Sequence, residues 1–180
     1  MKATGIVRRV DELGRVVIPK EIRRTLRIKE GDPLEIFTER DELTFKKYSP
    51  IATIEQFSES AARSLQQISG RTCLVCDTDG VLHVFGDGRK EFLGKSVSKE
   101  MENVMYARKS YAASRAEGGE IVPITLAGEE KISAEIIVPV VSSGDCLGAV
   151  ALLMREDGAK IDKTTLDLVR LTADILANQF

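Results

Sequence analysis

Residues 4–28 read TGIVRRVDELGRVVIPKEIRRTLRI, and this stretch contains the most informative sequence features of the chain. A short apolar segment over residues 6–10 precedes an Asp-Glu-Leu-Gly turn, and Val16–Ile18 follows it. The second segment is β-branched throughout, which favours a strand. Pro19 suits the first position of a helix, where no N–H is required. The stretch therefore predicts strand, turn, strand and a short helix over residues 20–26.

Residues 1–29 are strongly basic, with nine Lys and Arg against three Asp and Glu, although the whole chain has a formal net charge of −2. The nine are Lys2, Arg8, Arg9, Arg15, Lys20, Arg23, Arg24, Arg27 and Lys29. On a helix that turns about 100° per residue, the basic side chains occupy one arc and the apolar ones another. The basic arc comprises Lys20, Arg23, Arg24 and Arg27. Such a surface favours contact with nucleic-acid phosphates, with a solvated charged face as the alternative.

A second hairpin is predicted over residues 34–48, with its turn at residues 39–42. A unit of about 50 residues with four short strands and one helix buries little apolar surface, and such small units usually need outside help. No disulfide framework or metal-site spacing is present, so oligomerisation is the remaining common remedy. We expect an obligate dimer in which strands from two chains complete one sheet and present two basic arcs.

The residues GIVRRVDELGRVVIPKEIRRTL, followed by KEGDPLEIF, resemble the AbrB-like swapped-hairpin domain of bacterial transition-state regulators. The D-E-L-G-R-V-V-I-P block and the following R-R-T-L occur in order and at fixed spacing. The resemblance implies that residues 1–50 form an intertwined β-barrel dimer that binds double-stranded DNA. It carries the DNA contacts onto Arg8, Arg9, Arg15, Arg23 and Arg24. The same fold occurs in antitoxins, so an antitoxin-type regulator is an alternative.

The charge balance changes sign near residue 50. Residues 1–50 carry twelve Lys and Arg against nine Asp and Glu, and residues 51–180 carry fourteen against nineteen. The net charges are therefore +3 and −5. The change falls at Ser49-Pro50, a pair that favours a non-helical junction. We expect two domains, residues 1–50 and residues 51–180.

The second domain is expected to be an antiparallel α+β fold, because strands and helices follow one another with short turns. The expected elements are a helix over 51–69, strands over 72–76 and 81–85, a helix over 99–114, strands over 120–125, 132–141 and 146–154, and a final helix after Asp162. Two of these helices carry an apolar stripe, which packs either on the domain's own sheet or on another copy. The stripes are Ile54, Phe57, Ala61, Leu65 and Ile68, and Leu166, Val169, Ala173, Leu176 and Phe180.

This order of elements, with LGAVALLMRE near the end, resembles a GAF domain over about residues 53–180. The residue set of cyclic-nucleotide-binding GAF domains and an obvious chromophore or haem attachment site are both lacking, which leaves any ligand unidentified. A chain with an AbrB-like N-terminal domain and a GAF-like C-terminal domain resembles sporulation regulators of spore-forming bacteria. The resemblance implies an activator and repressor of late, forespore gene expression, assembled as a homotetramer through its C-terminal domain.

The cysteines and the single histidine are the residues that could indicate other chemistry. Cys73 and Cys76 lie three apart on a predicted strand, so their thiols would face opposite sides. Adding Cys146 and His83 does not give the paired spacing of a structural zinc site. No Gly-x-Ser-x-Gly nucleophile or phosphate-binding loop is present. We expect no metal, no cofactor and no enzyme activity.

No apolar run approaches the roughly 18–20 residues that a membrane span needs, and the N-terminus lacks a signal-peptide pattern. With an odd number of cysteines, we expect a cytoplasmic, nucleoid-associated protein. The main hypothesis is a DNA-binding transcription regulator whose second domain senses a small molecule or controls assembly. The alternative is a ligand-binding or protein-interaction module whose N-terminal domain only dimerises.

Overall fold

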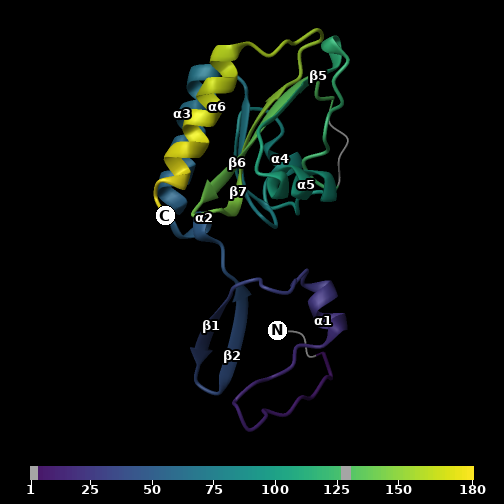
Figure 1. Cartoon of the computed structure of the whole chain (residues 1–180), viewed down its shortest axis with the longest axis vertical. Coiled ribbons are helices and arrows are strands. Elements are labelled where there is room, and N and C mark those ends of the chain that lie inside the picture. The colour runs from purple at the N-terminus through teal and green to yellow at the C-terminus, as the bar shows by residue number, and fades with distance from the viewer. Residues whose placement is uncertain (1–3, 127–130) are drawn as a thin grey trace. The chain divides into compact units, whose positions relative to one another are not determined.

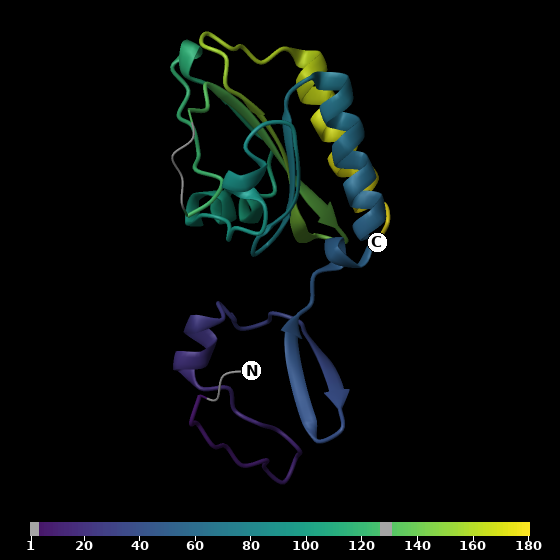
Figure 2. The ribbon, with the colours of Figure 1, turned by 180° about the vertical axis from the view of Figure 1, so that it is seen from behind.

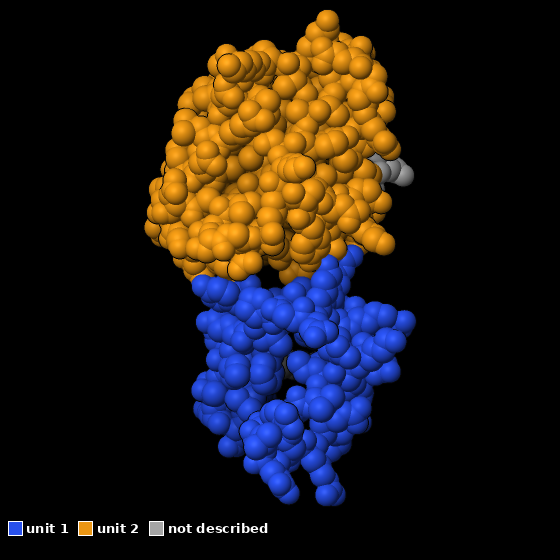
Figure 3. Space-filling model, viewed as in Figure 1, with its two compact units in different colours: residues 1–48 blue, residues 49–180 orange. Residues whose placement is uncertain are grey.

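The computed structural model describes residues 4–126 and 131–180. The chain divides into two compact units, Met1–Tyr48 and Ser49–Phe180 (Figure 3). The DNA-binding role expected for residues 1–50 and the sensing or assembly role expected for residues 51–180 stay predictions. Within the described residues, no helix is both long enough and apolar enough to cross a membrane.

The first unit contains one helix and one hairpin (Figure 1). These elements are α1 (Lys20–Thr25), β1 (Leu34–Glu39) and β2 (Glu42–Lys47). β1 and β2 are antiparallel, and Ile36 lies opposite Phe45. Arg40 takes a φ of +49° between the strands, the left-handed conformation that short hairpin turns require. The predicted helix and second hairpin are confirmed.

The two strands expected before α1 are not present in a single chain. Residues 11–14 form the predicted turn, but residues 4–10 and 15–19 belong to no strand. A strand exists only when its main-chain groups pair with a neighbour. Within the described part of this chain, the only ladder in the first unit is β1–β2. The expectation of two strands before α1 was therefore wrong for the described chain, because the main chain forms no ladder there.

None of the described residues from 4 to 50 is buried. Val7, Leu13 and Val17 are 84%, 75% and 73% exposed. Ile36 and Phe45, which share one face of the hairpin, are also exposed. The space-filling view shows the unit hollowed near its middle (Figure 3). Burial of apolar surface is the main force that stabilises a fold, so this unit lacks a core of its own.

The second unit has a five-stranded antiparallel sheet in the order β4-β3-β7-β6-β5. Its strands are β3 (Thr72–Asp77), β4 (Val81–Phe85), β5 (Tyr111–Ser114), β6 (Ala134–Ser142) and β7 (Asp145–Met154). Its helices are α2 (Pro50–Thr53), α3 (Glu55–Ser69), α4 (Arg89–Phe92), α5 (Lys99–Ala107), the 3-10 turn Arg115–Glu117 and α6 (Lys163–Ala177). The helices α3 and α6 run side by side along one face, and α4 and α5 lie on the other (Figures 1 and 2).

The sheet is buried on both faces. One core cluster joins Val75 and Leu152 of the sheet to Leu176 of α6. The other joins Leu74 of β3 to Met101 of α5. Burial on both sides explains why β3, β6 and β7 are nearly continuous apolar runs rather than alternating ones.

Several expected elements of this unit were wrong in their limits. The helix over 51–69 is broken at Ile54, whose φ of −107° and ψ of 38° separate α2 from α3. The helix over 99–114 stops at Ala107, because Arg108 has a φ of +54°. The strand β5 follows where the predicted helix would have continued. The short helix α4 was not predicted. Residues 120–125 form no strand and contribute one isolated bridge, Val97–Thr125.

The predicted helix starts are confirmed by their caps. Ser98 Oγ accepts a hydrogen bond from the Met101 N–H at 2.9 Å. Asp162 Oδ1 accepts one from the Thr165 N–H at 2.8 Å. Each bond satisfies a donor that the first turn of a helix leaves open.

Candidate nucleic-acid interface

The turn over residues 11–15 is organised by one carboxylate. Asp11 Oδ1 accepts hydrogen bonds from the N–H groups of Leu13 at 3.0 Å and Arg15 at 2.8 Å. Asp11 Oδ2 accepts one from Arg15 Nε at 2.7 Å. Gly14 supplies the left-handed backbone, with a φ of +76°. The bonds from Arg15 hold the pKa of Asp11 below its usual value.

The helix α1 carries two of the expected DNA contacts near its C-terminal end. Pro19 is the residue before the helix, with a φ of −57° and ψ of 149°, rather than its first helical residue. Arg23 and Arg24 lie in the last turn, where the partial negative charge of the helix end favours cations. Arg27 lies beyond the helix with a φ of +53°. Its expected place on the basic arc of the helix was therefore wrong.

The five arginines expected to contact DNA lie on residues 4–10, which we call the arm, on the turn over residues 11–15, and on α1. Arg8 and Arg9 are exposed on the arm, and Arg23 and Arg24 are exposed on α1. Among the described residues, these four form no ion pair. Arg15 pairs with Asp11, yet its side chain is 71% exposed. Exposed cations that no carboxylate neutralises are available to phosphate groups.

A second candidate surface lies between α3 and α6. It is a groove of about 320 Å³. Its lining consists of Phe57, Ser60, Ala61, Ser64, Leu65, Ile68, Leu168, Leu171, Thr172 and Ile175. Ile68 is 69% exposed and Leu171 is 56% exposed. Contiguous apolar exposure of this kind marks an interaction surface.

The predicted stripe of α6 packs mainly on the domain's own sheet, which is one of the two alternatives considered above. Val169, Ala173 and Leu176 of the α6 stripe are buried in the domain's own core. The exposed residues Leu171 and Ile175 belong to a second stripe on the same helix, which the 3-4 spacing analysis missed. Their spacing of four residues was the available signal.

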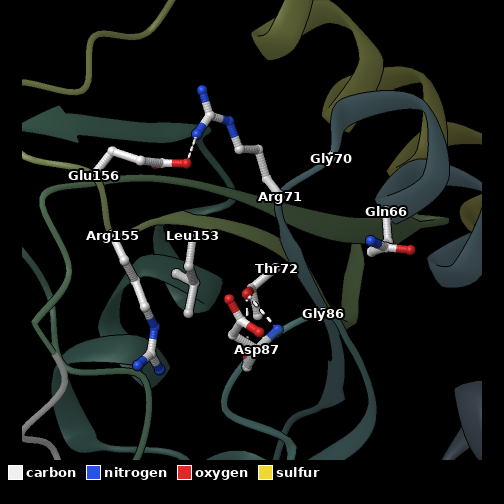
Figure 4. Close-up of a pocket in the computed structure, with 9 residues that line it drawn as sticks. All are labelled: Gln66, Gly70, Arg71, Thr72, Gly86, Asp87, Leu153, Arg155 and Glu156. Atoms are coloured by element: carbon white, nitrogen blue, oxygen red, sulfur yellow. Dashed lines mark hydrogen bonds and ion pairs between the residues drawn. The ribbon is translucent and has the colours of Figure 1, made fainter.

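A polar cavity of about 220 Å³ lies at the ends of β3, β4 and β7 (Figure 4). Two arginines line it, and both already have partners. Arg71 pairs with Glu156, and Arg155 pairs with Glu91. Thr72 Oγ1 is bonded to the main chain of Asp87. Because these charges are neutralised within the protein, the cavity does not identify a ligand.

Glu135 is a fully buried carboxylic acid on β6. Its Oε1 accepts a hydrogen bond from the Val122 N–H at 2.6 Å, and its Oε2 has no hydrogen-bond partner among the described residues. Burial raises the pKa of Glu135 to about 7, against a smaller opposing effect of the Val122 bond and Arg115. Glu135 was not among the predicted candidate residues, although it is the lone acid within the apolar run AEIIVPVV.

The cysteines and histidine have structural surroundings. Cys73 lies in one core cluster and Cys76 in the other. Burial raises the pKa of both thiols to about 12, far from thiolate reactivity. His83 Nε2 lies 3.0 Å from Ser58 Oγ, and burial lowers its pKa. Over residues 4–126 and 131–180, no three His, Cys, Asp or Glu side chains gather in a metal-binding arrangement.

Two family descriptions match this chain. One is "Stage V sporulation protein T C-terminal, transcription factor", over residues 53–180. The other is "Antidote-toxin recognition MazE, bacterial antitoxin", over residues 7–52.

Curated relatives of this chain from Bacillus subtilis (strain 168) include a sporulation protein and a transition state regulator. Stage V sporulation protein T is 46% identical over 157 residues, which are 87% of this chain and 86% of that protein. The transition state regulatory protein AbrB is 45% identical over 87 residues, which are 48% of this chain and 88% of that protein.

Among solved structures, the GAF domain from Acinetobacter phosphoenolpyruvate-protein phosphotransferase has a TM-score of 0.55 at 12% identity. The match covers 72% of this chain and 89% of that domain. At this identity the likeness concerns the fold alone. Together with the AbrB relative, it confirms the expected pairing of an AbrB-like domain with a GAF-like antiparallel domain.

Proposed function

This chain belongs to the stage V sporulation protein T family of transcription factors, and we propose that arginines of its N-terminal dimer contact the DNA through which it regulates sporulation-stage genes. The contacts are Arg8, Arg9, Arg15, Arg23 and Arg24. The observation that carries this proposal is that four of the five are exposed and form no ion pair within the described residues, while the chain as a whole is acidic.

The dimer follows from the absence of buried residues in the described part of the first unit. Within the described residues, the segments 4–10 and 15–19 belong to no strand, and a second copy can supply strand partners for them. Its apolar side chains would then cover Val7 and Val17, which are open in one chain. A two-fold dimer doubles the arginine set, so that phosphate contacts fix the protein on the duplex and a few arginines read base edges.

Single substitutions Arg8→Ala, Arg15→Ala, Arg23→Ala and Arg24→Ala are each expected to weaken DNA binding without dissociating the dimer. Every arginine that binds a phosphate releases counterions, so losing one such contact should lower the magnitude of the slope of log affinity against log salt by roughly one. Each substitution removes two arginines from the dimer, so the magnitude of the slope should fall by roughly two if both contact phosphates. Fluorescence anisotropy, on a duplex that the parent protein selects from a random pool, measures both affinity and slope.

The matched control for these variants is Arg40→Asn. It removes a cation from the β1–β2 turn, and Asn tolerates the left-handed backbone there. This control should bind like the parent. If all four alanine variants also bind like the parent across salt concentrations, the assigned contacts are wrong and an N-terminal domain that only dimerises is favoured.

We further propose that two dimers associate through the α3–α6 groove into a tetramer. The occupant is the same groove of a second copy, because one apolar patch can pair with itself across a two-fold axis. The exposed residues Phe57, Ile68, Leu171 and Ile175 supply the apolar contact. Such an assembly places two DNA-binding dimers in one particle, on the nucleoid in the cytoplasm.

Leu171→Asp is expected to convert the tetramer into a dimer. Leu171 is 56% exposed in one chain, so the change should cost the single domain no more than about 0.5 kcal/mol. A charge buried between copies without a partner costs far more. Sedimentation velocity measures the assembly, and Gln67→Asp provides the same charge on α3 outside the groove. A Leu171→Asp protein that remains tetrameric would place the contact elsewhere.

A further inference from the structure

We propose that Asp11 is a positioning residue, which holds Arg15 in the orientation in which Arg15 contacts DNA. This inference rests on the proposed function, because it takes Arg15 to be a DNA contact. One carboxylate accounts for most of the hydrogen bonds in the turn that joins the two residues.

Asp11 fixes both the main chain and the side chain of Arg15. Its Oδ1 accepts from the Arg15 N–H at 2.8 Å, and its Oδ2 accepts from Arg15 Nε at 2.7 Å. The Asp11 N–H donates in turn to the Arg15 carbonyl oxygen at 3.0 Å. Three bonds thus join two residues four positions apart. The turn thus holds the Asp11 carboxylate where it accepts the hydrogen bond from Arg15 Nε.

The pairing leaves the rest of the guanidinium accessible. Only Nε takes part in it, and the Arg15 side chain is 71% exposed. The terminal nitrogens Nη1 and Nη2 form the planar fork that binds a phosphate or the edge of a guanine. An unrestrained arginine loses side-chain freedom on binding, and a restrained one loses less. Asp11 therefore reduces the entropic cost of the contact.

The sign of the effect separates positioning from simple electrostatics. Asp11 is a carboxylate close to a surface that faces phosphate groups, so its charge by itself opposes DNA binding. Neutralising a carboxylate there should strengthen binding if charge is all that matters. If Asp11 orients Arg15, Asp11→Asn should weaken binding in spite of the more favourable charge. Asn retains an oxygen acceptor for the turn amides, so the turn itself is preserved.

The experiment compares Asp11→Asn, Glu12→Gln, Arg15→Ala and the double variant Asp11→Asn/Arg15→Ala in the full chain. Glu12→Gln is the matched control, because it removes the same charge from the neighbouring residue, which does not pair with Arg15 among the described residues. Affinity is measured by anisotropy on the selected duplex and on an unrelated duplex. Circular dichroism and sedimentation establish that each variant is folded and assembled.

Asp11→Asn is expected to weaken binding to the selected duplex by roughly two- to tenfold for each Arg15 side chain of the dimer that contacts DNA. Glu12→Gln should bind as tightly as the parent protein or more tightly. In the Arg15→Ala background, Asp11→Asn should cause no further weakening. Should Asp11→Asn fail to fold, Asp11→Ser takes its place, because a serine hydroxyl can accept from the same amides.

Two results would overturn the inference while the proposed function stands. In the first, Arg15→Ala weakens binding but Asp11→Asn strengthens it as Glu12→Gln does. In the second, Asp11→Asn weakens the Arg15→Ala protein as much as it weakens the parent. If Arg15→Ala itself binds like the parent, Arg15 is no contact, and both the inference and that part of the proposed function are wrong.

Discussion

Replacing Ile36 by Asp is expected to prevent the first unit from dimerising and folding, and to abolish DNA binding with it. Ile36 is 58% exposed in a single chain, where such a change normally alters stability by no more than about 0.5 kcal/mol. In the proposed dimer, the apolar hairpin face that Ile36 shares with Phe45 is covered by the partner. Two unpaired carboxylates buried there should cost more than about 3 kcal/mol per dimer. Sedimentation equilibrium and circular dichroism measure the loss.

The control for this substitution is Thr44→Asp. Thr44 lies opposite Phe37, on the other face of the same hairpin. The two variants carry the same charge and the same number of altered residues. If Ile36→Asp dimerises as tightly as Thr44→Asp, the apolar face is not the dimer contact, and the intertwined arrangement has to be abandoned.

The second large effect concerns Glu135 and pH. The pKa of Glu135 is about 7 in the folded chain and 4.5 when exposed. The unfolded chain therefore loses this proton at a lower pH than the folded chain does. The resulting stability is present below pH 4.5 and is lost as the pH rises to about 7, with a total of about 3 kcal/mol. Urea unfolding at fixed protein concentration, at pH 5.5 and pH 8, measures most of this loss.

Glu135→Gln should remove this part of the pH dependence, because its amide does not titrate. Glu117→Gln removes an exposed carboxylate and should keep the parent's pH dependence. The comparison between variants cancels the other titrating groups. A Glu135→Gln protein that loses as much stability as the parent between pH 5.5 and pH 8 contradicts the burial of a protonated Glu135.

Local signals in the sequence were sufficient for much of the fold. The caps Ser98 and Asp162, and the Asp-rich turn before Gly80, act over three or four residues and are readable directly. The boundaries that failed depend on tertiary contacts. Arg108 ends α5 with a left-handed backbone, a conformation that the arginine side chain does not predict. The segment β5 is a strand only because β6 pairs with it.

The candidate site shows the same division. The arginines and the turn at Gly14 are visible in the sequence, and the exposed state of Arg23 and Arg24 agrees with the predicted basic arc. The hydrogen bonds that Arg15 donates to the Asp11 carboxylate could not be predicted without the geometry of the turn. The two strands expected before α1 form no ladder within the described residues. We propose that a second chain supplies their pairing, which sequence periodicity does not reveal. Leu171 lines the α3–α6 groove while Leu176 packs in the core, a difference that appears only in the folded domain.

We propose that a dimer binds DNA phosphates through Arg8, Arg9, Arg15, Arg23 and Arg24. The most direct measurement is the slope of log affinity against log salt for the full chain and for the quadruple variant Arg8→Ala/Arg15→Ala/Arg23→Ala/Arg24→Ala. Eight arginines are removed from each dimer, so the slope should fall by several units, by roughly one for each phosphate that is no longer neutralised, while sedimentation still shows the parent's assembly. A folded quadruple variant with the parent's slope and affinity would contradict the claim.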